Sequence, residues 1–168
     1  MVTSKTLVVL RHAKSSWEET DKSDFDRTLM ERGINDIRLL AHEVKDRLGN
    51  IDVIFSSPAN RAIHTAILFA QTVGFPLENI RIVESLYETN ELYMEEFVKG
   101  LPNELNSIVV VGHNPTSTDF VNLFLNNSID NIPTSGLVKL VFDTISWKGI
   151  SKGVLKSSFF DYPKNHQK

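Results

Sequence analysis

Thr6-Leu7-Val8-Val9-Leu10 is an uninterrupted apolar run near the start of the chain, and Arg11 and His12 follow it directly. Such a run predicts a strand that is buried on both faces. Two further largely apolar runs, Ile51-Asp52-Val53-Ile54-Phe55 and Ile108-Val109-Val110-Val111-Gly112, come later in the chain. Helical patterns separate the three runs, so we expect parallel strands whose carboxyl ends lie at one edge of a sheet.

The segments between these runs carry helical periodicity. Between residues 31 and 48, apolar residues recur at steps of three and four, and Gly49-Asn50 ends the pattern. We expect a helix from about Pro58 to Val73, with Ser56 or Ser57 as its N-cap and Pro58 in its first turn. Further helices are expected at 92–101 and 116–125, and strands at 80–86, 137–142 and 153–159. We expect the last two strands at the sheet edge. This order predicts a three-layer α/β/α sandwich with a mostly parallel sheet.

Length and composition restrict the class of protein. The 168 residues fit one domain over 1–168, with a tail that is frayed from about residue 162. A net charge of -3 gives no support for nucleic-acid binding, and no apolar stretch is long enough to span a membrane. The first residues lead into a strand rather than into a signal-peptide region. We therefore expect a cytoplasmic protein with neither nucleic acid nor membrane as a partner.

The chain contains no cysteine. This excludes disulfides, thiolate metal sites and phosphatase chemistry with a cysteine nucleophile. The five histidines lack the close pairing with carboxylates that a metal centre needs, so we expect no metal and no cofactor. Chemistry on phosphate would then depend on histidine, arginine and carboxylate.

Arg11 and His12 form the first candidate pair. A neutral imidazole at a strand end can attack phosphorus when a hydrogen bond to its other nitrogen fixes the tautomer. A guanidinium beside it can bind phosphate oxygens through its planar fork. One such pair alone is weak evidence for catalysis.

Arg61 and His113 lie at two further strand ends. Arg61 is in the first turn of a helix, where the helix dipole favours an anion rather than a cation. A bound anion explains this arginine, and so does an ion pair with a surface carboxylate. His113, as imidazolium, can stabilise a transferring phosphoryl group, and its alternative is a buried histidine bonded to backbone. Because strand ends meet at one edge, these side chains are expected to converge on a phosphate.

Several ordered blocks resemble the histidine phosphatase superfamily. Arg11-His12-Ala13-Lys14-Ser15 resembles its Arg-His-Gly motif in an Arg-His-Ala-Lys-Ser variant, and residues 26–33 resemble its Arg-Pro-Leu-Thr-x-x-Gly segment, with Thr28 replacing the usual proline. Further similar blocks are residues 56–62, 111–115 and 133–136. The last is similar to a block of the small phosphohistidine phosphatases, the SixA-like branch. The resemblance covers about residues 6–145.

The resemblance implies a phosphoglycerate mutase-like fold and a phosphatase with a phosphohistidine intermediate. It implies that His12 is the nucleophile and that Arg11, Arg61 and His113 complete the phosphate pocket. It also implies a phosphate or substrate contact for Arg27, which lies on a loop.

Glu88 follows the strand expected at 80–86. It matches the position where mutases and ester-cleaving members of the family carry a general acid. A carboxyl beside a bound phosphate has a raised pKa, which suits proton donation. The alternative is a solvated loop glutamate.

Other residues near these motifs are expected to have structural or solvent roles. Lys14-Ser15-Ser16 is expected to begin a solvated loop over 14–30, and His64 to be partly buried. Trp17 and Trp147 are expected to be packing residues rather than ligand platforms.

The predicted function is that of a metal-independent phosphohydrolase acting on phosphohistidine in a protein. The chain is too short for the insertions that roof the pocket in mutases and sugar phosphatases, so an open pocket is expected. The alternatives are a small-molecule phosphomonoesterase, a mutase-type transferase and a phosphate-dependent binding module without turnover. The expected partner is accordingly a phosphorylated protein or a small phosphorylated substrate.

Overall fold

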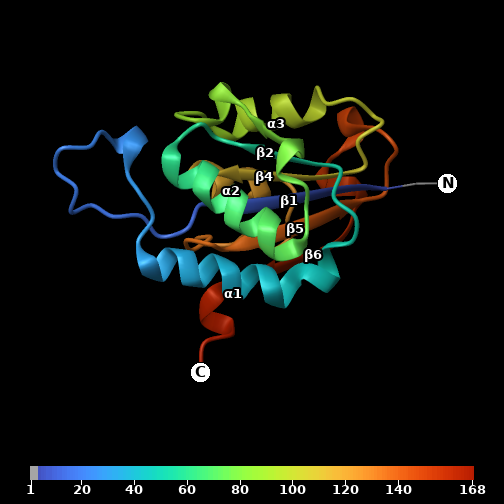
Figure 1. The fold of residues 1–168 in the computed structure, drawn as a ribbon. Coiled ribbons are helices and arrows are strands. Elements are labelled where there is room, and N and C mark those ends of the chain that lie inside the picture. The colour runs from blue at the N-terminus through green and yellow to red at the C-terminus, as the bar shows by residue number, and fades with distance from the viewer. Residues whose placement is uncertain (1–3) are drawn as a thin grey trace.

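In the computed structural model, which describes residues 4–168, a six-stranded sheet lies between two layers of helices (Figure 1). The strands are β1 (Lys5–Arg11), β2 (Val53–Ser56), β3 (Ile80–Ile82), β4 (Ser107–Gly112), β5 (Leu137–Phe142) and β6 (Leu155–Asp161). The helices are α1 (Glu31–Leu48), α2 (Asn60–Val73), α3 (Glu91–Lys99) and α4 (Thr116–Asn122). No helix within residues 4–168 has the length and apolar character that a membrane crossing needs.

The sheet has the strand order β3-β2-β4-β1-β5-β6. The first four strands in this order pair in parallel, whereas β5 and β6 pair antiparallel. This confirms the predicted three-layer sandwich with a mostly parallel sheet.

Alternate residues of the central strands enter two separate cores. Val8 and Leu10 of β1 belong to the cluster that includes the buried residues of α1 and α2. Leu7 and Val9 belong to the cluster with buried residues of α3 and α4. Both faces of β1 are therefore buried, as its apolar run predicts.

Strand register brings the candidate residues together. Arg11 of β1 is the register partner of Gly112 of β4, so His12 and His113 leave neighbouring strands at the same level. Ser56 of β2 is the register partner of Val111, which brings Ser57 to that level as well. All three strands run in parallel, and their carboxyl ends form one edge of the sheet.

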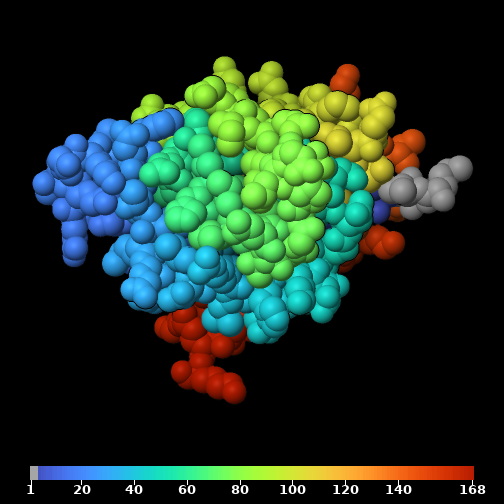
Figure 2. Space-filling model, in the orientation of Figure 1, coloured from blue at the N-terminus to red at the C-terminus, as the bar shows by residue number. Residues whose placement is uncertain are grey.

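The segment between β1 and α1 projects from the body of the molecule beyond this edge (Figure 2). Its first residues pack closely on α1, where a Cβ atom on Gly33 would lie 2.2 Å from the Lys14 carbonyl oxygen. Glycine is therefore required at residue 33 for this approach. Ser15 forms a bridge with Leu29, which closes the base of the projecting segment.

Some elements differ from their sequence-based expectations. The strand expected over 80–86 ends at Ile82 because its partner β2 ends at Ser56, and a 3-10 turn (Glu84–Leu86) follows. The strand at 137–142 was expected at the sheet edge, but β5 lies inside the sheet because β6 pairs with its outer side.

The end of the chain also differs from expectation. Residues from Tyr162 were expected to be frayed, yet His166 contacts Asp161 at 2.9 Å and Gln167 donates a hydrogen bond to Asp36 of α1. Gln167 and Asp36 are 131 residues apart, so the sequence of the tail gave no sign of their contact.

Candidate active site

A pocket of about 410 Å³ opens at the carboxyl edge of the sheet. Five of the predicted site residues line it, namely Arg11, His12, Arg27, Arg61 and His113. Its other lining residues are Lys14, Ser15, Trp17, Asp24, Asn114 and Thr134. The ends of β1 and β4, the start of α2 and the projecting segment thus meet around one hollow.

His12 lies on the pocket floor and is 7% exposed. Its Nδ1 lies 2.8 Å from the Ala13 carbonyl oxygen. Because a carbonyl can only accept, the neutral ring carries its proton on Nδ1 and keeps a lone pair on Nε2. The Ala13 backbone is fixed in turn, since its N–H donates to Thr65 Oγ1 at 2.9 Å and that hydroxyl donates to the Arg61 carbonyl.

Both histidines of the pocket are held neutral. Burial has the largest influence on the pKa of His12, and together with the neighbouring His113, Arg61 and Arg11 it lowers this pKa to about 3, although the hydrogen bond to the Ala13 carbonyl raises it. Burial and the charge of Arg61 lower the pKa of His113 to about 4. The ring centroids are 5.2 Å apart. Without an anion beside them, both imidazoles are unprotonated at neutral pH.

Ser57 positions His113. Its Oγ lies 2.7 Å from His113 Nε2, and it also accepts a hydrogen bond from the Ala59 N–H. Ser56 or Ser57 was expected to cap the next helix with Pro58 in its first turn, but α2 begins only at Asn60 after Ala59. Ser57, which follows β2, therefore positions His113, which follows β4, rather than capping α2.

The three arginines of the pocket are each held by the surrounding chain. Arg11 donates from Nη1 to the Ile132 carbonyl oxygen at 2.8 Å, and burial lowers the pKa of this guanidinium. Arg27 donates to Ser15 Oγ at 2.7 Å. Arg61 is 5% exposed, so burial and neighbours fix its fork.

Unpartnered buried donors gather in this pocket. Within residues 4–168, the buried side-chain nitrogens without a hydrogen-bond partner are Nε of Arg11, Nε of Arg61 and Nδ1 of His113. An unsatisfied buried donor is costly, and the two arginine N–H groups, joined by His113 Nδ1 when that ring is protonated, favour a ligand that accepts hydrogen bonds. An oxyanion has this chemistry.

Asp24 is a site residue that the sequence analysis did not single out. Its carboxylate accepts from Arg27 Nε at 3.1 Å, from Arg61 Nη2 at 3.2 Å and from the Tyr87 hydroxyl at 2.8 Å. Burial favours its neutral form, but Tyr87, Arg61 and Arg27 together outweigh burial and lower the pKa of Asp24. Two explanations were given for Arg61, an ion pair with a carboxylate and a bound anion. The structure shows the ion pair with Asp24 inside the pocket where an anion would bind.

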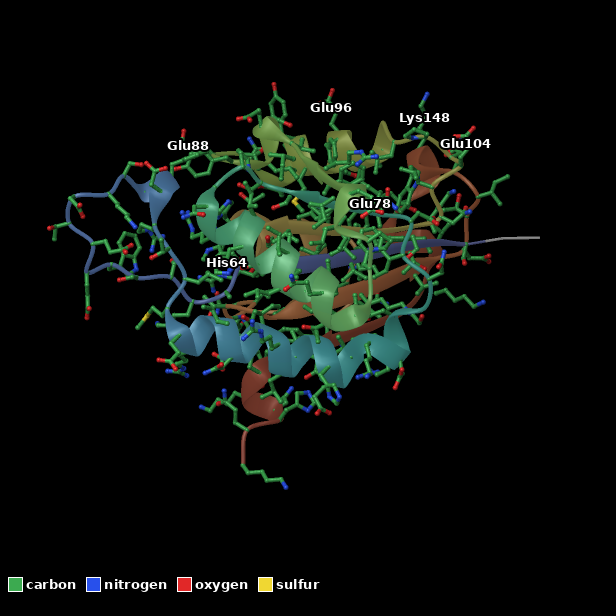
Figure 3. The ribbon with its side chains drawn as sticks, viewed as in Figure 1. His64, Glu78, Glu88, Glu96, Glu104 and Lys148 are labelled. Atoms are coloured by element: carbon green, nitrogen blue, oxygen red, sulfur yellow. The ribbon has the colours of Figure 1, made fainter. Side chains whose placement is uncertain are left out.

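Glu88 does not line the His12 pocket. It lies in an adjoining hollow of about 230 Å³ that shares Asp24, Arg61 and His113 with that pocket. Its side chain is exposed at the outer edge of the molecule (Figure 3). Glu88 therefore lines a hollow that adjoins the pocket, whereas the other predicted residues line the pocket itself. His64 is half-buried on α2, as expected.

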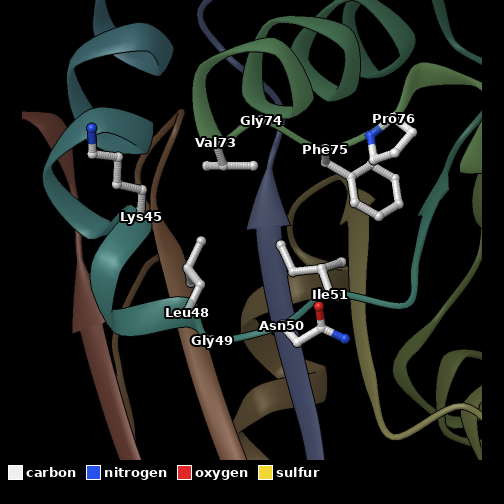
Figure 4. A pocket seen from close by; sticks show the side chains of 9 residues that line it. All are labelled: Lys45, Leu48, Gly49, Asn50, Ile51, Val73, Gly74, Phe75 and Pro76. Carbon is white, nitrogen blue, oxygen red and sulfur yellow. The ribbon is translucent and has the colours of Figure 1, made fainter.

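Another hollow, of about 180 Å³, lies between the C-terminal ends of α1 and α2 (Figure 4). Lys45 is the ionisable residue among its lining residues, which otherwise include Leu48, Val73 and Phe75. It lies at the amino-terminal edge of the sheet, away from His12. Within residues 4–168, no group of three His, Asp or Glu side chains is arranged to hold a metal ion.

The sequence model of the histidine phosphatase superfamily, branch 1, matches residues 7–96, which include the ends of β1 and β2 and the start of α2. The chain belongs to this superfamily. It is 32% identical over 120 residues to an uncharacterized chloroplastic protein of Arabidopsis thaliana, covering 66% of this chain and 55% of that protein. It is 32% identical over 103 residues to phosphoserine phosphatase 1 of Hydrogenobacter thermophilus, covering 54% and 48%. The chain thus spans about half the length of these curated relatives.

Solved structures of the superfamily have the same fold. SixA of Agrobacterium tumefaciens superposes with a TM-score of 0.73 at 28% identity, covering 83% of this chain and 92% of that one. The protein histidine phosphatase SixA in complex with tungstate gives 0.76 at 19% identity, with 96% and 99% covered. Phosphoglycerate mutase of Bacillus anthracis gives 0.63 at 16% identity, with 86% and 90% covered. These structures confirm the expected phosphoglycerate mutase-like fold. Among them, the SixA structures superpose on this chain with the higher TM-scores.

Proposed function

We propose that this histidine phosphatase superfamily member is a phosphatase that transfers a phosphoryl group to His12 and then to water, and that its substrate is phosphohistidine on a protein. The observation that carries the proposal is the pairing of a neutral, oriented imidazole with buried, unpartnered nitrogens of Arg11, Arg61 and His113 around one pocket. A nucleophile and an oxyanion site are both needed for phosphoryl transfer, and they occur together here.

In the first step, Nε2 of His12 attacks phosphorus and forms an N–P bond. Arg11, Arg61 and His113 neutralise the oxygens of the phosphoryl group, with Arg27 contributing a further contact. A bound phosphate counteracts the positive neighbours that lower the pKa of His113, which favours the imidazolium form in the complex. The bond from phosphorus to the leaving group breaks on the side opposite His12.

The leaving group takes up a proton, and the second step consumes water. A nitrogen of an imidazole leaving group accepts that proton readily, so the exposed position of Glu88 is compatible with this substrate. Water then attacks phosphorus, the N–P bond breaks, and free phosphate leaves. Asp24 is ionised and lines the pocket, and we propose that it takes the proton of the attacking water.

An open pocket supports a protein substrate. Trp17 and Asp24 line the pocket and are exposed, and the segment over residues 14–30 projects away from the body of the molecule (Figure 1). The similarity to SixA phosphohistidine phosphatases favours the same substrate class. One curated relative is instead a phosphoserine phosphatase, so a small phosphomonoester is the second candidate. A cytoplasmic location stays a prediction.

The test measures phosphate release, with a chelator present, from a phosphohistidine protein, from phosphoserine and from an aryl phosphate. Wild-type protein is compared with His12→Ala and with His42→Ala, whose histidine is exposed on α1. Mass spectrometry of quenched reactions follows the phosphoryl adduct. We expect turnover and an adduct in wild type and His42→Ala, and a loss of about a thousandfold or more in His12→Ala.

The substrate preference separates the two candidates. Faster release from the phosphohistidine protein supports the proposal, whereas faster release from phosphoserine favours the phosphomonoesterase. Phosphate binding without turnover or adduct would contradict both and would favour the binding module.

A further inference from the structure

Trp17 differs from the other residues that line the His12 pocket because it is a large apolar side chain and is 76% exposed. The expectation that it packs in the core is wrong, whereas Trp147 is fully buried as expected. Leaving an indole in water is unfavourable, and a large exposed aromatic group beside a pocket indicates a binding surface.

The indole is held in a defined orientation. The guanidinium carbon of Arg27 lies 3.5 Å from the centroid of the Trp17 ring. Arg27 is itself 7% exposed and is fixed by hydrogen bonds to Ser15 and Asp24. Trp17 therefore stacks on a guanidinium plane that is already fixed, and most of the ring surface stays exposed to solvent at a residue that lines the pocket.

The chemistry of the pocket determines what reaches this ring. His12 lies on the floor, and in-line transfer requires the leaving group on the far side of phosphorus from Nε2. The leaving group therefore points outward, toward the mouth where Trp17 is exposed. In the proposed reaction the phosphate binds deeper than this mouth, beside the buried, unpartnered nitrogens of Arg11, Arg61 and His113.

We propose that Trp17 determines specificity by forming a platform on which a flat, unsaturated leaving group stacks, and that this group is the imidazole ring of a phosphohistidine side chain. The inference rests on the proposed function and adds to it a residue that selects the leaving group. An imidazole or phenyl ring has a π face that can cover the indole. The aliphatic side chain of phosphoserine has none and gains little from this surface.

The test compares Trp17→Leu with wild type on a phosphohistidine peptide, phenyl phosphate and a phosphoserine peptide. We expect kcat/KM to fall about tenfold on the first two, mainly through KM, because one stacking contact is lost. On phosphoserine we expect less than a twofold change. Trp17→Phe keeps a π face and should restore most of the loss. Tyr93→Leu removes another exposed aromatic residue, from α3 and outside this pocket, and should change nothing.

Inhibition by inorganic phosphate distinguishes a platform from a mere support for Arg27. If Trp17 is a platform, the inhibition constant for phosphate stays within twofold in Trp17→Leu. Equal losses on all substrates with weaker phosphate inhibition would overturn the inference, as would unchanged kinetics. A wild-type protein that cleaves none of the substrates refutes the proposed function before any variant is compared.

Discussion

The floor and the mouth of the His12 pocket are built in different ways. On the floor, His12 and His113 follow paired strands, are largely buried and have strongly lowered pKa values. At the mouth, Trp17 and Asp24 come from the projecting segment between β1 and α1 and are exposed. The sheet edge therefore fixes the positions of the reacting groups, whereas the segment outside the sheet controls which molecules approach them.

Arg61 joins these two parts, so among the residues other than the nucleophile its replacement should have the largest effect. Arg61→Lys keeps the charge but removes the fork that contacts the Asp24 carboxylate and backbone. We expect kcat/KM to fall by about a hundredfold to a thousandfold, as for loss of one oxyanion donor. Arg81→Lys, on an exposed arginine of β3, is the matched control. Steady-state phosphate release checks both variants, and a loss below threefold in Arg61→Lys would place the phosphate elsewhere.

The buried floor predicts a pH-dependent stability. An unfolded histidine takes up a proton near pH 6.5, whereas His12 and His113 do so in the folded state only near 3 and 4. Between these values the unfolded state binds more protons, so stability falls as the pH drops below 6.5. From about pH 7.5 to 5.5 the two histidines together should cost about 2.5 kcal/mol.

Urea unfolding at the two pH values measures this loss. Replacing one floor histidine, in His113→Gln, should remove about half of it. The exposed control His42→Gln should leave it unchanged. An equal pH dependence in all three proteins would show that the floor histidines are not held neutral.

Thr65 tests whether orientation of His12 matters beyond its burial. Thr65→Val keeps the shape of this fully buried side chain but removes the hydroxyl that holds the Ala13 N–H. We expect a loss of about 1 to 2 kcal/mol in stability from the unpaired N–H. We also expect about a tenfold fall in kcat, because the Ala13 carbonyl no longer holds the His12 ring firmly.

Thr65→Ser is the matched variant that retains the hydroxyl. It should recover kcat while losing some packing, so kinetics and thermal unfolding together separate the two contributions. Equal kcat in Thr65→Val and Thr65→Ser would contradict a role in orienting His12.

The sequence predicted the floor well because its signals are local. Arg11, His12 and His113 directly follow apolar runs, and the ends of parallel strands meet by the geometry of the fold. The structure brings these side chains to one pocket, and their catalytic roles stay predictions. Gly33 belongs to the block over residues 26–33 that resembles the family. Its close approach to the Lys14 backbone explains why glycine is needed there.

The mouth could not be predicted in the same way. Asp24 is one of several acidic residues of its segment, and its partners Arg61 and Tyr87 lie 37 and 63 residues away. The residues next to Asp24 in the sequence do not distinguish it from the other acidic residues of the segment. The position of Trp17 depends likewise on how residues 14–30 project, which hydrophobic periodicity does not specify. Glu88 followed the expected strand, but the early end of β3 and the 3-10 turn place it outside the pocket.

The effect of Asp24→Asn on phosphate binding is the smallest change expected, and it separates the mouth from the floor most directly. The carboxylate is 48% exposed and contacts Arg27 and Arg61, the same guanidinium groups that a phosphate would contact. Its negative charge therefore competes with a bound anion. Removing the charge should tighten inhibition by inorganic phosphate about fivefold, a change of about 1 kcal/mol that suits a partly exposed ion pair.

The same substitution should slow the second step, because asparagine cannot take a proton from the attacking water. Phosphoenzyme should therefore accumulate in Asp24→Asn, as mass spectrometry of the quenched reaction would detect, while its formation on His12 continues. Asp26→Asn, which removes a carboxylate of the same segment outside the pocket, should leave both phosphate inhibition and adduct level unchanged. Weaker phosphate inhibition in Asp24→Asn would mean that the carboxylate orients the two arginines for the anion rather than competing with it. In that case residues of the mouth, like those of the floor, would contribute to phosphate binding.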